Sequence, residues 1–150
     1  MKKIYLCLLL ILMPMVFFSQ EKESFKLKDI IFLKENAGEK VDYFLKSRFF
    51  EFVKTNEEHQ AYEYGLNYNK NTKKATIWVI KEFDGDVSIV EAGEGLLLKY
   101  IKEELENYKE DFEYQENSWT MSTFNYKSYE ILIRENNVLE EYMLFIQDKI

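Results

Sequence analysis

The chain has few of the residue types that carry metal, redox or nucleophilic chemistry. Its 150 residues include one cysteine, one proline, one histidine and five glycines. The cysteine, Cys7, and the proline, Pro14, both fall within residues 1–19. A chain with one cysteine cannot form an intramolecular disulfide. One histidine cannot form a two-histidine zinc site, so the composition predicts neither a disulfide scaffold nor such a metal centre.

The motifs of common catalytic and cofactor sites are also missing. His59 follows Glu57 and Glu58 in a polar stretch that indicates an exposed loop, and no serine occupies a Gly-x-Ser-x-Gly elbow. The stretch Gly93-Glu94-Gly95 lacks the third glycine and the Lys-Ser or Lys-Thr of a phosphate loop. The stretch Asp84-Gly85-Asp86 lacks EF-hand spacing and fits a hairpin turn. We therefore expect no cofactor and no metal, and a catalytic role is the less favoured interpretation.

The N-terminus has the pattern of a secretory signal. Lys2 and Lys3 precede an apolar run over residues 4–18, and Ser19 and Gln20 end it. The run is too short to span a bilayer comfortably, and charged residues follow it at once. We predict a signal peptide over residues 1–19 and a single domain over residues 20–150, exported to a periplasm or cell surface. Cleavage after Ser19 and an uncleaved anchor both stay open.

The charge balance bears on the kind of partner. The whole chain has a net charge of −7, and removal of residues 1–19 takes away two lysines and no acid, which leaves −9. Phosphate backbones and anionic membranes need clustered Lys and Arg, so the charge argues against nucleic acid or an anionic membrane surface as a partner, and we expect no nucleic acid. An acidic surface suits another protein, especially a basic one.

The first half of the chain predicts a helix followed by three strands. Apolar residues recur at helical spacing from Val41 to Val53, which indicates a helix over residues 38–54. Alternation of large and polar residues then predicts a strand at 62–68, and an apolar run predicts a central strand at 76–83 with Trp78 in the core. Asp84-Gly85 favours a hairpin to a third strand at 87–90. Residues 30–33 are interpreted as a short strand or a tucked arm.

The second half repeats this order. Apolar spacing predicts a helix over residues 97–112, and alternation predicts strands at 119–123 and 129–133. Residues 138–148 fit a hairpin strand better than a capped helix, although both stay open. We therefore predict an α+β fold, with an antiparallel sheet of five or six strands and two helices on one face. The similar openings Ala37-Gly38-Glu39 and Ala92-Gly93-Glu94 also suggest a duplicated α-β-β-β unit.

Two groups of residues are candidates for a binding site. The first is aromatic, because a tyrosine combines a large apolar ring with a polar tip. It consists of Tyr62, Tyr64 and Tyr68 on one strand, extended by Trp119. For the tyrosines a half-buried core face is the favoured alternative. The second group is the acidic helix with Glu103, Glu106 and Glu110, for which a solvated face paired with lysines four residues away is favoured.

These observations favour an exported, non-catalytic binding or inhibitory protein. It would act on another envelope protein through a sheet face or the acidic helix. Two alternatives stay open. One is a small glycan-active enzyme that uses paired carboxylates, and the other is a carrier of a small apolar ligand. The partner, the oligomeric state and the specific function are not encoded in any motif of the sequence.

Overall fold

A computed structural model describes residues 25–93, 95–116, 118–136 and 138–149 of the chain. The predicted signal peptide therefore lies outside the described residues. The elements are, in chain order, α2 (Leu27–Glu35), α3 (Glu39–Ser47), β1 (Phe50–Asn56), β2 (Ala61–Leu66), β3 (Ile77–Glu82), β4 (Val87–Ala92), α4 (Leu96–Leu105), the 3₁₀ turn η1 (Glu106–Tyr108), β5 (Lys109–Glu116), β6 (Trp119–Tyr126), β7 (Tyr129–Asn136) and β8 (Glu141–Asp148). None of the helices in these ranges is long and apolar enough to cross a membrane.

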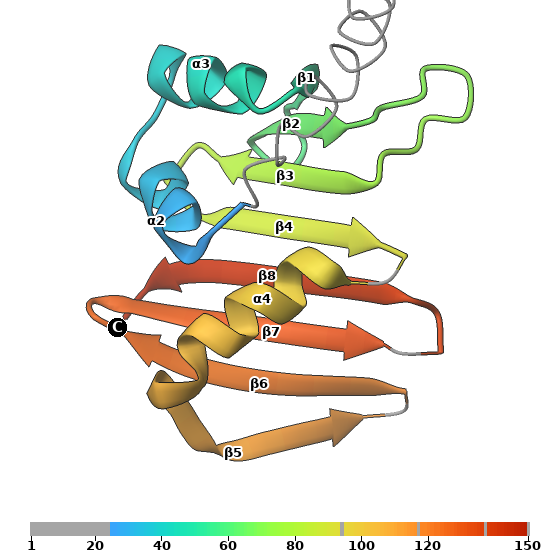
Figure 1. Ribbon diagram of the computed structural model, residues 1–150. Helices are drawn as coiled ribbons and strands as arrows, with labels where there is room; N and C mark the ends of the chain where they lie inside the picture. The colour runs from blue at the N-terminus through green and yellow to red at the C-terminus, as the bar shows by residue number, and fades with distance from the viewer. Residues whose placement is uncertain (1–24, 94, 117, 137, 150) are drawn as a thin grey trace, which may run out of the picture.

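The strands form one eight-stranded sheet in the order β1-β2-β3-β4-β8-β7-β6-β5 (Figure 1). Every neighbouring pair is antiparallel. The sheet consists of two four-stranded meanders, β1 to β4 and β5 to β8, which are joined at the centre where β4 pairs with β8. Each meander runs in chain order from one edge of the sheet to this centre. The α+β class and the antiparallel sheet predicted from the sequence are confirmed.

All three helices of the described residues lie on one side of the sheet (Figure 1). One row of directly paired residues crosses the sheet beneath them, from Val79 through Ile89 and Leu144 to Ile133. Each residue of this row is 0% exposed, and it packs with Ile30 of α2, Leu45 of α3 and Ile101 of α4, among others. We refer to this side as the covered face. It contains the hydrophobic core.

The predicted count of five or six strands is too low because both long helices end earlier than their spacing suggests. The helix predicted over 38–54 ends at Ser47, and Phe49 then takes a left-handed φ of 66°. That conformation is rare for an aromatic residue and directs the chain into β1. The helix predicted over 97–112 ends at Leu105, and η1 leads into the polar edge strand β5.

Residues 30–33 are helical, not the short strand or tucked arm predicted from the sequence. They belong to α2, which buries Leu27, Ile30 and Leu33 along one side. This spacing of three residues is the signature of a helix that faces the core. The carboxylate of Asp29 accepts a hydrogen bond from the backbone N–H of Lys26 at 2.9 Å, which helps to begin the helix.

Three further sequence predictions agree with the structure. Gly85, at a φ of 110°, turns the chain between β3 and β4, as the Asp-Gly pair suggested. The segment 138–148 contains strand β8 and no helix. His59 is exposed in the turn between β1 and β2.

The start of α4 is held by a buried carboxylate that no motif revealed. Glu91, 8% exposed on the covered face of β4, accepts hydrogen bonds from the backbone N–H groups of Leu97 and Leu98 at 3.2 and 3.1 Å. A carboxylate is favourable at this end of a helix because the unpaired N–H groups carry partial positive charge. At Gly95, φ is 63°, and an added Cβ would lie 2.5 Å from the ring of Tyr142. Only glycine fits this position.

Candidate functional site: the open face of the sheet

The side of the sheet opposite the helices carries large, partly exposed side chains. Successive residues of a strand point to opposite faces, so the neighbours of the buried row lie on this other side. One row of directly paired residues runs from Trp78 through Val90, Met143 and Arg134 to Met121, and a second includes Ile80, Ser88, Phe145, Leu132 and Thr123. All of these except the buried Ser88 are of intermediate exposure. We name this surface the open face.

Trp78, predicted from the sequence to be core, lies on the open face. Its backbone pairs with Gly65 on one side and with Val90 on the other. The ring of Tyr68 meets the Trp78 ring edge-on, with centroids 5.5 Å apart. A Cβ at Gly65 would lie 3.1 Å from the Cβ atoms of Ala75 and Tyr68, so the absence of a side chain there makes room for Tyr68. The two rings form an aromatic end to the open face.

The three tyrosines singled out from the sequence do not share one surface. Tyr64 is 4% exposed and belongs to the core on the covered face. Tyr62 points to that same face but is exposed and packs against Phe83. Asn67, with a left-handed φ of 53°, ends the strand geometry before Tyr68, which lies against Trp78. The structure therefore brings only Tyr68 to the open face.

Trp119, the fourth aromatic candidate, does lie on the open face, beside Arg134. The Arg134 guanidinium carbon is 5.0 Å from the centroid of the Trp119 ring. Arg134 also helps to line a hollow of about 320 Å³ in the open face, together with Met121, Glu130, Leu132, Phe145 and Gln147. The lining thus combines three apolar side chains with one cation, one anion and one amide. Gln147 donates a hydrogen bond to Glu130 at 2.6 Å.

The chain has two arginines, and their environments differ. Arg48 stacks on Phe44 at 3.8 Å and donates a hydrogen bond to Asp29 at 3.0 Å. Arg134 has an aromatic neighbour too, but it forms no hydrogen bond or ion pair with any residue that the structure describes. The Nε atoms of both arginines are enclosed without a partner, and the terminal nitrogens of Arg134 are not enclosed. Arg134 is therefore a charge whose partner the described fold does not supply.

The acidic candidates lie on α4, on η1 and at the start of β5. Glu103, Glu106 and Glu110 are all exposed. Glu103 and Glu106 line a second hollow of about 510 Å³, which also includes Lys99, Lys102, Glu135 and Tyr142. Lys102 forms an ion pair with Glu135 of β7, not with Glu106 four residues away as expected. Glu110 accepts a hydrogen bond from Asn125. This surface is a mixture of both charges.

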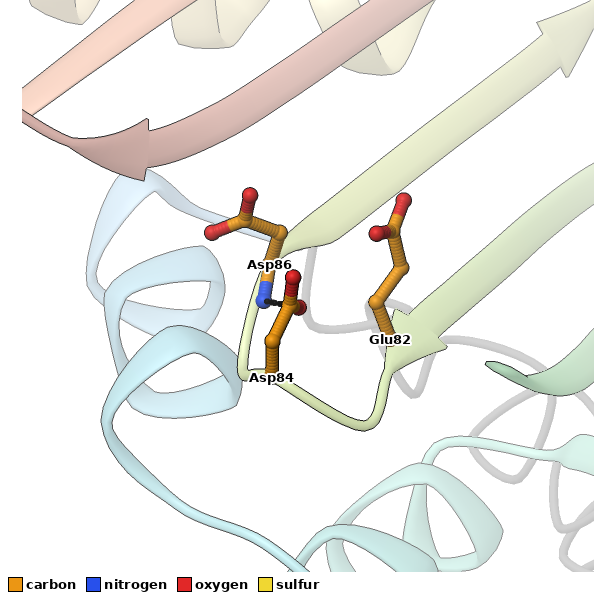
Figure 2. A group of neighbouring side chains, drawn as sticks. All are labelled: Glu82, Asp84 and Asp86. Atoms are coloured by element: carbon orange, nitrogen blue, oxygen red, sulfur yellow. Dashed lines mark hydrogen bonds between the residues drawn. The ribbon is translucent and has the colours of Figure 1, made fainter. Parts of the chain in front are cut away.

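A third group of acids lies at the β3–β4 turn. Figure 2 shows Glu82, Asp84 and Asp86 around this turn, and the backbone N–H of Asp86 donates a hydrogen bond to Asp84. Their carboxylate oxygens lie within 4.8 Å of one another. Lys34 of α2 forms an ion pair with Asp86 at 2.8 Å and another with Asp148 of β8 at 2.8 Å. These contacts tie α2 to the turn before β4 and to the end of β8.

Buried charge around this turn shifts three pKa values. Burial lowers the pKa of Lys34, but the hydrogen bonds and charges of Asp148 and Asp86 outweigh it, so that the pKa is raised. Burial and the nearby Lys34 ammonium lower the pKa of Lys81, which donates a hydrogen bond to the carbonyl of Gly85 at 2.5 Å. Burial, Asp84 and Asp86 raise the pKa of Glu82. The ammonium groups of Lys34 and Lys81 therefore lie close to the carboxylates of the turn, and Lys34 is paired with one of them, Asp86.

No family model, curated protein or solved structure matches the chain. The residues of the site therefore have to be judged by their geometry. Sequence reasoning missed Arg134, Leu132 and Phe145. One signal was present: Ile131 and Ile133 alternate in the predicted strand, which places Leu132 and Arg134 on the opposite face.

Proposed function

We propose that this protein binds another protein through the open face of its sheet. The observation that carries the proposal is a set of apolar side chains, partly exposed on the central strands, around an arginine with no partner among the described residues. Exposed apolar surface that is contiguous and rimmed by polar groups is typical of interaction sites. Trp and Arg, which adjoin on this face, are also enriched among residues that dominate binding energy.

The open face supports the proposal better than the acidic helix does. Lysines lie among the glutamates of α4, and one of them pairs with the sheet. That arrangement is typical of a solvated surface that satisfies its own charge. The open face instead combines rigid strands with unsatisfied apolar and cationic groups. We keep the acidic helix as a secondary contact at most.

The two other candidate functions have weaker support. The hollow of about 320 Å³ lies on a sheet face, whereas pockets for small apolar ligands enclose most of the ligand surface. The carboxylates of the β3–β4 turn suit a glycan-active enzyme less well, because two lysine ammonium groups accompany them. A protein partner therefore fits the described surface best.

We also propose that the protein meets its partner outside the cytoplasm and that its two halves are copies of one unit. The basic and apolar order of residues 1–19 supports export. The mirrored strand order supports duplication, with each unit one strand longer than the sequence suggested. Each unit also opens with a helix before its four strands, α3 in the first half and α4 in the second.

A comparative capture experiment tests binding through the open face. The purified protein is immobilised and exposed to envelope extract of the producing cell at low and high salt. The test variant is Leu132→Thr with Phe145→Thr, since threonine preserves the strand while it removes the apolar surface. The matched control is Tyr100→Gln on α4, a residue 54% exposed on the other side of the sheet.

We expect a partner that the wild type and Tyr100→Gln retain equally and that the double variant loses. An apolar interface should persist at high salt, because screening weakens only the charged contacts. Circular dichroism establishes that the double variant is folded. Equal recovery by the wild type and the folded double variant contradicts the proposal.

A further inference from the structure

We infer that the partner contacts the open face with a carboxylate flanked by apolar side chains, and that this carboxylate pairs with Arg134. The inference rests on the proposed function and specifies the chemistry that the same surface recognises. It follows from the position of Arg134 in its row, from its lack of a partner in the described fold, and from the groups that surround it.

Arg134 is the charged member of an otherwise apolar row. Its direct cross-strand neighbours on the open face are Met143 of β8 and Met121 of β6. Directly opposed residues in an antiparallel sheet lie close enough for their side chains to touch. The ring of Trp119 lies beside the guanidinium and restricts its orientation. The charge is therefore held in place within apolar surroundings.

A partner that covers this row removes water from the guanidinium. A buried charge is costly unless it is paired and hydrogen-bonded, and the described residues supply no acceptor. The terminal nitrogens of Arg134 are the ones that a partner can reach, because only Nε is enclosed. A carboxylate fits them best, since its two oxygens can accept two parallel hydrogen bonds from one guanidinium.

The other residues that line the hollow limit the number of acidic side chains that the partner can place there. Glu130 lines the same hollow and already accepts a hydrogen bond from Gln147. A second carboxylate near Glu130 would be repelled. Apolar groups of the partner can instead contact Leu132 and Phe145, which lie between Arg134 and Glu130. The surface thus favours one acid at the Arg134 end, followed by apolar side chains.

Arg48 shows within the same molecule an arginine with a terminal nitrogen paired to a carboxylate, although its Nε, like that of Arg134, is enclosed without a partner. It too lies against an aromatic ring, and it is paired with the carboxylate of Asp29, whose side chain is 7% exposed. The proposed complex would give Arg134 the same set of neighbours, an aromatic ring and a carboxylate. The acid would then come from the partner.

Peptide selection tests the inference while the partner itself is still unidentified. The purified full chain is used to select from a random library of displayed peptides. Each recovered peptide that contains an acid is then synthesised twice, once unchanged and once with Asp replaced by Asn or Glu by Gln. Affinities of both forms are measured for the wild type, for Arg134→Gln and for Lys127→Gln. Lys127 is the matched control, because it is a cation 5.1 Å from an aromatic ring, in the turn after β6.

We expect peptides with one acid among apolar residues, and a loss of tenfold or more in affinity when that acid becomes an amide. Arg134→Gln should bind both forms with equal and reduced affinity, whereas Lys127→Gln should discriminate as the wild type does. Sedimentation measures whether the chain pairs with itself through the open face.

The alternative results separate the two proposals. Recovery of apolar peptides without an acid, or a preference for acid that Arg134→Gln retains, overturns the role of Arg134 and leaves binding by the open face intact. The folded Leu132→Thr/Phe145→Thr variant should select no peptide. If the wild type also selects none, that result contradicts the proposed function itself. A dimer that Arg134→Gln dissociates identifies a second copy as the occupant and overturns the inference of a separate partner.

Discussion

The two faces of the sheet are built from the same strands, but they differ in how their apolar side chains are covered and how their charges are paired. On the covered face, the apolar residues are enclosed by three helices, and the buried charges that hold the helices have partners. Glu91 binds the N–H groups of α4, and Lys34 binds Asp86 and Asp148. On the open face, neighbouring residues of the same strands are half-exposed, and Arg134 has no partner among the described residues. The comparison shows that structural side chains in this protein are buried and paired, whereas the candidate binding side chains are half-exposed and include an unpaired charge.

The largest expected difference between the faces is in the cost of removing an apolar side chain. Ile133 and Leu132 are consecutive in β7 and point to opposite faces. Ile133→Ala should lower the free energy of unfolding by about 2–5 kcal/mol, because it leaves a cavity in the core. Leu132→Ala should lower it by about 1 kcal/mol, because the side chain is already partly hydrated. Urea denaturation measures both values, and equal losses would mean that the open face is part of a core.

The next effect concerns the paired charges of the covered face. Glu91→Gln should lower the free energy of unfolding by about 2 kcal/mol, because it removes the negative charge at the start of α4. It also leaves one amide oxygen to accept hydrogen bonds from two N–H donors and places an NH₂ group beside them. Glu103→Gln on the exposed side of the same helix is the control, with a change below about 0.5 kcal/mol. Chemical denaturation at neutral pH measures the pair, and similar values for the two variants would refute the capping role of Glu91.

A smaller effect appears at high pH and distinguishes two tyrosines. Burial, with the charge of Asp42, raises the pKa of Tyr64 to about 12, above its usual value of 10.0. The unfolded chain releases the phenol proton first, so this group stabilises the folded state below pH 10 and the contribution declines as pH rises toward 12. Tyr64→Phe should reduce the loss of stability between about pH 9 and 11 by about 1 kcal/mol. Tyr68→Phe on the open face should leave this loss of stability unchanged. Unfolding curves for both variants across the same pH interval test the contrast.

Alternation in the sequence predicted most of the sheet but not its first and fifth strands. In β2, β3, β6, β7 and β8 the period of two residues, or the apolar run, identified strands correctly. Before β1, the apolar spacing of a helix continues past Ser47, although Phe49 adopts a left-handed φ and starts a strand. No residue type announces that conformation, because most positive φ values belong to glycine or asparagine. The polar strand β5 is defined by its pairing with β6, a long-range contact that local spacing does not contain.

The candidate site was harder to predict than the fold because it depends on which face the helices cover. In β3 the consecutive residues Trp78, Val79 and Ile80 are all apolar, so the sequence does not distinguish the two faces. The register and the helices place Val79 in the core and leave Trp78 and Ile80 on the open face. The tyrosines attracted attention by residue type, yet Tyr64 is buried. Arg134 lies in no motif, and its lack of a partner among the described residues is a property of the folded chain alone.

The smallest expected effect on stability is also the one that bears most directly on function. Arg134→Gln should change the free energy of unfolding by less than about 0.5 kcal/mol, because Arg134 makes no ion pair in the described fold that could be lost. Arg48→Gln should cost about 2 kcal/mol, since it removes the only ion pair that the described structure gives to the buried carboxylate of Asp29. Thermal and urea unfolding of the two variants give the comparison. A loss for Arg134→Gln as large as that for Arg48→Gln would show that Arg134 has a structural role within the chain. A negligible loss leaves recognition as the reason for a fixed, unpaired arginine on an apolar surface.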